Sequence, residues 1–179
     1  MKPKSIPRTA GIRSRGQLYL IAFFCALATV GESQPEEAAN EEKTNALASA
    51  FTQFKEQWQA SDVETVLIVH VPSESDYRLE YTPARLDMEG EFAMSVRWPK
   101  EQNITKELAA KIGQLTARVT GKDVPVRWGF VFLDRKGDRV FSIYLGEKGR
   151  KGMVNNIWVD FDSDALFKWA ESTFKQVFR

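Results

Sequence analysis

Cysteine is almost absent from this chain. Its 179 residues include a single cysteine, Cys25, which lies inside an apolar run near the N-terminus. If that run is removed as a signal segment, the remaining chain has no thiol, which excludes a disulfide framework, a cysteine nucleophile and zinc sites built on cysteine. Stability must then come from packing, and a content of 43% hydrophobic and 12% aromatic residues is enough for a core.

Histidine is equally scarce, because His70 is the only one, and it lies within an apolar run. A single imidazole cannot form a multi-histidine metal site, and no motif places a nucleophile and a carboxylate beside it. We therefore expect His70 to be structural. The serines considered as nucleophiles lack the glycine elbow of an esterase; they are Ser33, Ser73, Ser75, Ser95 and Ser142. No motif predicts a cofactor.

A strong excess of one charge is also missing. The chain has 25 basic and 24 acidic residues, a net charge of +1, but residues 1–33 hold five of the basic residues and one of the acidic ones. Residues 34–179 therefore carry 20 basic and 23 acidic residues and are weakly acidic. Non-specific binding of nucleic acid depends on a strongly basic field. We expect no nucleic-acid partner.

Long hydrophobic runs are the last feature that is missing. The apolar run Leu18–Val30 has thirteen residues, whereas a spanning helix needs roughly 20. The run follows a basic segment and precedes Gly31 and Ser33, which is the layout of a secretory signal peptide. We interpret residues 1–33 as a signal peptide, cleaved after Ser33 or, as second choice, Ala28, and expect a secreted or periplasmic protein. Membrane attachment is expected only if this segment stays uncleaved.

The rest of the chain is predicted to form one domain. Residues 34–43 (QPEEAANEEK) are acidic and small and are predicted to be a solvated linker. Residues 44–179 then suit a single domain in length. Apolar residues that recur every three or four positions predict three helices within it. These cover Thr44–Ala60, Asn103–Thr120 with Gly121 as its terminator, and Asp164–Phe178.

The clearest predicted structure is a β-hairpin over Val124–Gly146. Its first arm places Val126, Trp128, Phe130 and Phe132 on one side at period two, and both of its faces are mostly apolar, so that arm should be central. The polar turn 134–138 contains a glycine that can supply a positive φ. Alternation or β-branched content predicts further strands. They cover Val63–Val71, Tyr77–Tyr81, Phe92–Trp98 and, as an optional sixth strand, Val154–Phe161.

The resulting order is helix, three strands, helix, two or three strands, helix. Runs of strands separated by single helices favour an α+β domain, with helices packed on a mostly antiparallel sheet of five or six strands. In the order of its elements the chain is similar to bacterial secretion chaperones and related peptide-binding domains. The similarity extends to the order of elements only, with no shared motif, and an exported chain departs from those cytosolic chaperones. A protein or peptide partner is expected for this domain.

Four carboxylates near the C-terminus form the sharpest local pattern. Asp160, Asp162 and Asp164, with Glu171 further on, fall at positions 1, 3, 5 and 12 of a calcium loop of the EF-hand type. Position 6 of that loop needs glycine, and this chain has Ala165 there. The preferred interpretation is that Asp162, Ser163 or Asp164 caps the last helix and that its neighbours favour the helix dipole, with a divalent-cation site as the alternative.

A second candidate is the glycine-rich basic loop Gly146–Gly152. Lys148, Arg150 and Lys151 lie between its glycines and suggest anion binding. The loop lacks the lysine-serine or lysine-threonine ending of a phosphate loop and leads into a predicted strand. A mobile hairpin tip is the preferred interpretation.

The sequence thus favours an exported, non-enzymatic binding or accessory domain that acts through protein or peptide interaction. The alternative is a carboxylate-based hydrolase or divalent-cation-binding protein that uses the cluster Asp160, Asp162, Asp164 and Glu171. An aligned set of homologues would separate the two hypotheses best, because invariant exposed acids would favour the enzyme and an invariant apolar surface the binding domain.

Overall fold

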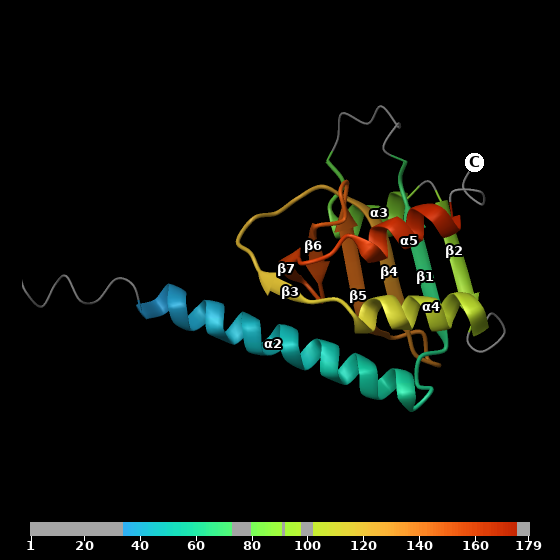
Figure 1. Cartoon of the computed structure of the whole chain (residues 1–179), viewed down its shortest axis with the longest axis horizontal. Coiled ribbons are helices and arrows are strands. Elements are labelled where there is room, and N and C mark those ends of the chain that lie inside the picture. The colour runs from blue at the N-terminus through green and yellow to red at the C-terminus, as the bar shows by residue number, and fades with distance from the viewer. Residues whose placement is uncertain (1–33, 73–79, 91, 98–101, 175–179) are drawn as a thin grey trace, which may run out of the picture. The chain divides into compact units, whose positions relative to one another are not determined.

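The structure is a computed structural model, and it describes residues 34–72, 80–90, 92–97 and 102–174. Within these residues the chain forms an α+β fold with four helices and a seven-stranded antiparallel sheet (Figure 1). The predicted fold class is confirmed, but the sheet has more strands than the five or six expected. The helices are α2 (Gln34–Gln59), α3 (Pro83–Glu89), α4 (Gln102–Gly113) and α5 (Ala165–Phe174). The strands are β1 (Thr65–His70), β2 (Phe92–Arg97), β3 (Ala117–Val119), β4 (Val126–Leu133), β5 (Arg139–Gly146), β6 (Lys151–Val154) and β7 (Ile157–Phe161).

The predicted hairpin is present as β4 and β5, inside a sheet of order β2-β1-β4-β5-β6-β7-β3. Its turn is held by Asp134, whose Oδ1 accepts the backbone N–H groups of Lys136 (2.8 Å) and Asp138 (2.9 Å). Gly137 adopts φ +85° there, as expected of a residue without a Cβ. Strand β4 has a partner on each side, β1 and β5, so the arm predicted to be central is indeed interior.

The segment predicted as one strand, Val154–Phe161, contains the end of β6, a two-residue turn and the whole of β7. Asn155 and Asn156 have φ values of 42° and 69°, and they connect β6 to β7 as a two-residue hairpin. Asparagine tolerates the left-handed region better than most residues, and two successive positive φ values suit the twist of antiparallel strands. The optional sixth strand is therefore two strands, the first of which starts at Lys151.

The predicted helix Asn103–Thr120 ends early. Helix α4 ends at Gly113, and the residues after it form β3, which pairs with β7 and places Val119 opposite Val159. Leu115 and Val119 fit the helical spacing by coincidence. Leu115 lies in the connection after α4, and Val119 lies in the short edge strand β3. Gly121, expected to end the helix, lies after that strand.

The strand predicted over Tyr77–Tyr81 is wrong for the part of that range that the structure describes. Residues 77–79 lie outside the described part of the chain, and Glu80 and Tyr81 are not in a strand. A short helix, α3, follows directly. Thr82 caps it by accepting the backbone N–H of Arg85 at 3.3 Å, and Pro83 occupies the first turn. Pro83 thus begins a helix, for which its fixed φ is well suited.

Helix α2 begins at Gln34, ten residues before the expected start, so the acidic segment predicted as a linker is helical. The side chains from Glu37 to Ala46 are exposed, and the first buried one is Leu47. The expected signal peptide, residues 1–33, lies outside the described residues, as do Trp98 and the end of the last predicted helix. No helix among the described residues is long and apolar enough to span a membrane.

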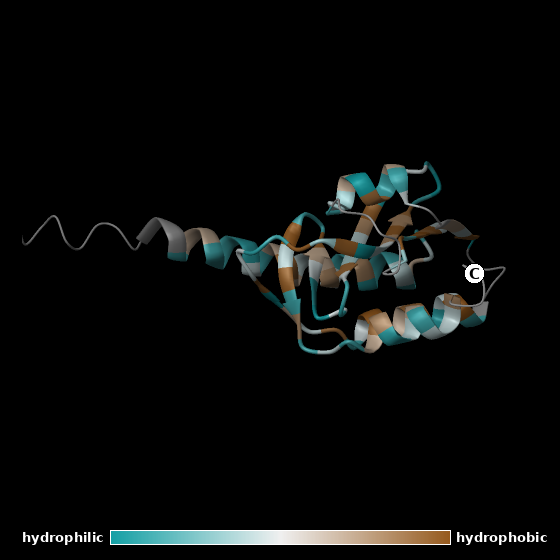
Figure 2. Cartoon of the chain, turned by 90° about the horizontal axis from the view of Figure 1, so that it is seen from above, coloured by the Kyte–Doolittle hydropathy of each residue, from teal (hydrophilic) through white to brown (hydrophobic). Residues whose placement is uncertain are grey.

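The sheet carries a core on each face. The larger core lies under α2, α4 and α5, and strand β4 contributes Trp128, Phe130 and Phe132 to it. The smaller core, on the opposite face, contains Leu86 of α3 together with Tyr144. Figure 2, which turns the view by 90°, shows helices on both sides of the sheet. Among the described residues, the short helix α3 covers the smaller face.

Candidate functional site

A β-bulge at Arg127 shapes one end of the sheet. In the pairing of β4 with β5, Val126 lies opposite Gly146 and Trp128 opposite Leu145, so Arg127 is an extra residue without a partner in that register. A bulge re-aims side chains and bends its strand. As a result Val126 belongs to the smaller core, whereas the alternation of the sequence placed it on the same side as Trp128.

The loop that joins β5 to β6 faces this bulge and packs against α5. Gly149 adopts φ +67°, and its backbone N–H donates to the Gly146 carbonyl oxygen at 2.9 Å. A Cβ on Gly149 would overlap the side chain of Phe167 in α5. The loop connects two hairpin strands, as predicted, and Gly149 at its centre is buried. Its course is therefore set by packing as well as by turn geometry.

Between the bulge and the loop lies a cavity of about 330 Å³, which we call the basic pocket. Its surface is mostly apolar, and its rim carries four cationic side chains and one acidic one. The residues around it are Val124, Pro125, Arg127, Gly146, Glu147, Lys148, Arg150 and Lys151. The structure thus brings the three basic residues singled out from the sequence to one pocket, and adds Arg127 to them.

The four cations of the basic pocket differ in how far they are neutralised. Nη1 of Arg127 is buried and has no hydrogen-bond partner, and within the described part of the chain Lys148 forms no ion pair. Arg150 Nη1 donates to the Asp162 carbonyl oxygen at 3.2 Å. Lys151 Nζ lies 3.9 Å from Asp160 Oδ1, a loose pair between half-exposed side chains that is worth little. Arg127 and Lys148 are the two cations of the pocket for which the described residues supply no side-chain partner.

A smaller cavity of about 210 Å³ adjoins the basic pocket and shares three of its residues, Arg127, Glu147 and Lys148. We call it the histidine pocket, because His70 contributes to its wall. The His70 ring stacks on the Trp128 indole with 3.8 Å between ring centroids, and its Nδ1 donates to the Arg127 carbonyl oxygen at 3.1 Å. These contacts fix the imidazole in place, as expected of a structural residue.

The four carboxylates of the predicted calcium loop have separate partners. Asp160 faces Lys151, whereas Asp162 accepts the Thr116 hydroxyl at 2.9 Å. Asp164 pairs with Lys168 at 3.1 Å, and that hydrogen bond lowers the pKa of Asp164.

Glu171 points elsewhere, because its Oε1 accepts the indole N–H of Trp128 at 2.9 Å. Among the described residues no three acids, histidines or cysteines are placed to hold a metal ion. The divalent-cation hypothesis stays a prediction without a donor set in this part of the chain. The cap of α5 comes from Ser163, whose Oγ accepts the backbone N–H of Ala165 at 3.1 Å.

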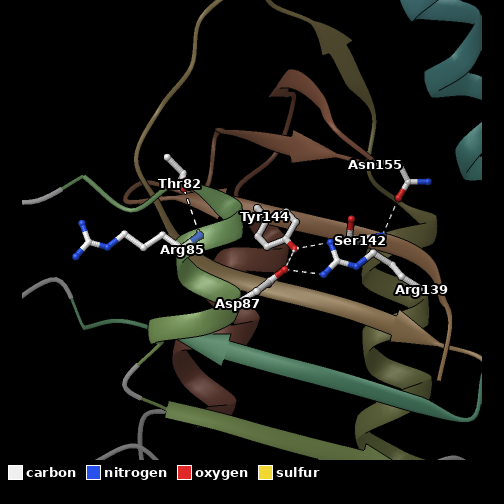
Figure 3. A network of polar contacts seen from close by, with 7 residues as sticks. All are labelled: Thr82, Arg85, Asp87, Arg139, Ser142, Tyr144 and Asn155. Carbon is white, nitrogen blue, oxygen red and sulfur yellow. Dashed lines mark hydrogen bonds and ion pairs between the residues drawn. The ribbon is translucent and has the colours of Figure 1, made fainter.

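A polar network on the opposite face was not predicted from the sequence. Figure 3 shows Asp87 of α3 pointing toward Tyr144 and Arg139 of β5. The Tyr144 hydroxyl donates to Asp87 Oδ2 (2.7 Å), and Arg139 donates both to the same oxygen (2.6 Å) and to the Tyr144 hydroxyl (3.1 Å). The network ties α3 to the sheet, and Asp87 lies 57 positions before Tyr144, a separation that no local pattern can signal.

This network predicts a pH dependence at alkaline pH. Burial, together with the hydrogen bond to Asp87 and its negative charge, raises the pKa of Tyr144 above the ordinary value of about 10. A raised pKa contributes stability that is complete below the unfolded pKa and is lost as the pH rises above it. We expect Tyr144→Phe to lose about 1 kcal/mol at neutral pH, where the hydrogen bond is removed.

The difference in unfolding free energy between the parent and Tyr144→Phe should then shrink, by up to about 1.4 kcal/mol per pH unit above pH 10. Urea unfolding at several pH values measures it, and the many lysines cancel in the comparison. A difference that stays constant with pH would show that the Tyr144 hydroxyl is not held neutral by its surroundings.

Comparisons of the chain with protein-family models, with curated proteins and with solved structures found no match. The function of the protein is therefore inferred from the geometry of the molecule.

Proposed function

We propose that this protein is an exported binding domain without catalysis of its own, and that a protein or peptide partner inserts a negatively charged group into the basic pocket. The observation that carries the proposal is Arg127, which lines both the basic pocket and the histidine pocket and whose buried Nη1 has no hydrogen-bond partner among the described residues. Buried polar groups are almost always hydrogen-bonded, and one left unsatisfied costs about 1–3 kcal/mol. A ligand anion in the pocket would supply the counter-charge that the described residues do not give this guanidinium.

The charges around the pocket support the same assignment. Four cations and one carboxylate surround a mostly apolar surface, although residues 34–179 as a whole are weakly acidic. A local excess of positive charge on an acidic body steers an anionic partner to one place, and the apolar surface supplies most of the contact. At about 330 Å³ the cavity lies at the lower end of the range of ligand pockets, which run from about 300 to 1,000 Å³.

Export is part of the proposal and rests on residues 1–33, whose basic start and short apolar run match a signal peptide. The partner is then a secreted or periplasmic protein or peptide. The alternative of a carboxylate-based hydrolase has less support, because such chemistry needs acids that act together. Asp162 and Glu171 are instead engaged by Thr116 and Trp128, and Asp160 lies in a loose pair with Lys151.

A selection from a random hexapeptide library with free carboxyl termini tests the proposal. We expect enriched peptides to bind the parent protein and to bind Arg127→Gln at least about tenfold more weakly, since a hydrogen bond to a charged group contributes about 1.5–3 kcal/mol. Isothermal titration with the best peptide measures the affinity.

Arg135→Gln is the matched control. It removes the same charge from an exposed side chain, 78% accessible, in the turn between β4 and β5, where the contact with Glu64 is a loose 3.9 Å. Equal affinities of the peptide for the two variants would contradict a role for Arg127. The absence of any enriched peptide would contradict the proposed function itself.

A further inference from the structure

We infer that the group taken by the basic pocket is a single carboxylate attached to an apolar residue, as at the C-terminus of a polypeptide chain. The inference rests on the proposed function and specifies its ligand. It follows from three features: the shape and apolar surface of the pocket, the kind of cation that is free in it, and the acidic residue at its rim.

The surface of the pocket requires a ligand with an apolar part close to its charge. Val124 and Pro125 line the cavity, and Gly146 adds backbone without a side chain. An internal aspartate or glutamate of a partner would bring a charge but no apolar group on the same residue. A C-terminal Leu, Val or Phe carries both on one Cα. A volume of about 330 Å³ suits one or two residues.

The available cations favour carboxylate over phosphate. A guanidinium presents two parallel N–H donors that match the two oxygens of a carboxylate. Phosphate-binding loops instead direct several backbone N–H groups at the ligand. Here the central amide of the loop is already used, because the Gly149 N–H donates to the Gly146 carbonyl oxygen.

Glu147 limits the charge that the site accepts. It is exposed and lies at the rim of both the basic pocket and the histidine pocket. Its carboxylate repels a second negative charge on a ligand that Arg127 and Lys148 hold. A monoanion is favoured over a dianion for this reason.

The experiment compares four probes by isothermal titration with the full-length mature chain. They are the peptide acetyl-Gly-Ser-Gly-Leu with a free carboxylate, the same peptide as its C-terminal amide, octanoate, and inorganic phosphate. We expect the acid peptide to bind at least about tenfold more tightly than the amide, because the amide loses the charge-assisted pair with Arg127. The affinity of Arg127→Lys for the acid peptide should lie between those of the parent and Arg127→Gln, because lysine keeps the positive charge but lacks the two parallel N–H donors.

Lys148→Gln is a second variant, chosen because this side chain is exposed and has no partner among the described residues whose loss would affect folding. This variant should also bind the acid peptide more weakly than the parent does, whereas Arg135→Gln should bind it as tightly as the parent. An amide that binds as tightly as the acid would overturn the inference and leave the proposed function standing. Octanoate or phosphate binding in place of the peptide would overturn it in favour of a free acid or a phosphate. If none of the four probes binds, the inference is wrong. If the library selection yields no enriched peptide, the proposed function is wrong as well.

Discussion

Phe130→Ala should lower the free energy of unfolding by about 3–5 kcal/mol, the usual cost of deleting a buried phenyl ring. Phe130 is completely buried in the middle of β4, between Ile68 of β1 and Ile143 of β5 in the ladder. Its ring stacks with that of Trp128, 6.2 Å away between centroids, and contacts Trp169 of α5 at 6.4 Å. Its loss would open a cavity where the sheet meets α5, and urea unfolding measures the effect.

Lys136→Ala is the control for this change. Lys136 is exposed in the turn of the same hairpin, and its backbone N–H, which the mutation leaves intact, makes the contact with Asp134. Exposed substitutions of this kind stay within about 0.5 kcal/mol. Equal urea midpoints for the two variants would mean that β4 does not carry the core.

The hairpin of β4 and β5 was predictable because two independent signals agree there. Alternating apolar residues set the faces of the strands, and the polar turn with Gly137 sets their connection. The buried faces of α2 and α5 followed equally from helical spacing. In each case the signal is local and needs no knowledge of the neighbour that covers it.

Other elements were mispredicted because their local sequence pattern is compatible with two different structures. Asn155 and Asn156 sit inside an otherwise strand-like run, and only their positive φ values reveal a turn. Leu115 and Val119 fit a helix by spacing, but pairing with β7 makes the second of them a strand residue. Tertiary pairing decides such cases, and a sequence pattern does not contain it.

The candidate site was likewise predictable only in part. Lys148, Arg150 and Lys151 were noticed because a glycine-rich basic loop is visible in the sequence, and the structure places them around one pocket. Arg127 was missed, although an arginine between Val126 and Trp128 is a charge within an apolar strand, which is a usable signal. What the sequence could not supply is the bulge that gives this residue its position. Anion binding by the loop itself stays a prediction.

Gly152→Ala should be about as disruptive as a core deletion, for the opposite reason. Gly152 pairs with Leu145 in the β5–β6 ladder, and a Cβ there would overlap the carbonyl oxygen of Tyr144 and lie 3.0 Å from Cε2 of Phe161. The obstacle is the backbone of the neighbouring strand, which cannot move aside as a side chain can. Overpacking of this kind costs about 1–3 kcal/mol and occasionally more, and we expect about 3 kcal/mol.

Thermal unfolding of Gly152→Ala beside Gly121→Ala gives the measurement, because the two changes add the same methyl group. Around Gly121 the added Cβ meets nothing within 4 Å, and its φ is not positive, so this variant should stay within about 0.5 kcal/mol of the parent. A loss of 3 kcal/mol corresponds to a fall of roughly 6–12 °C in a chain of this size. Matching melting temperatures for the two variants would show that β6 does not lie against β5 as described, and the loop that carries Lys148 would then lose its fixed position beside the basic pocket.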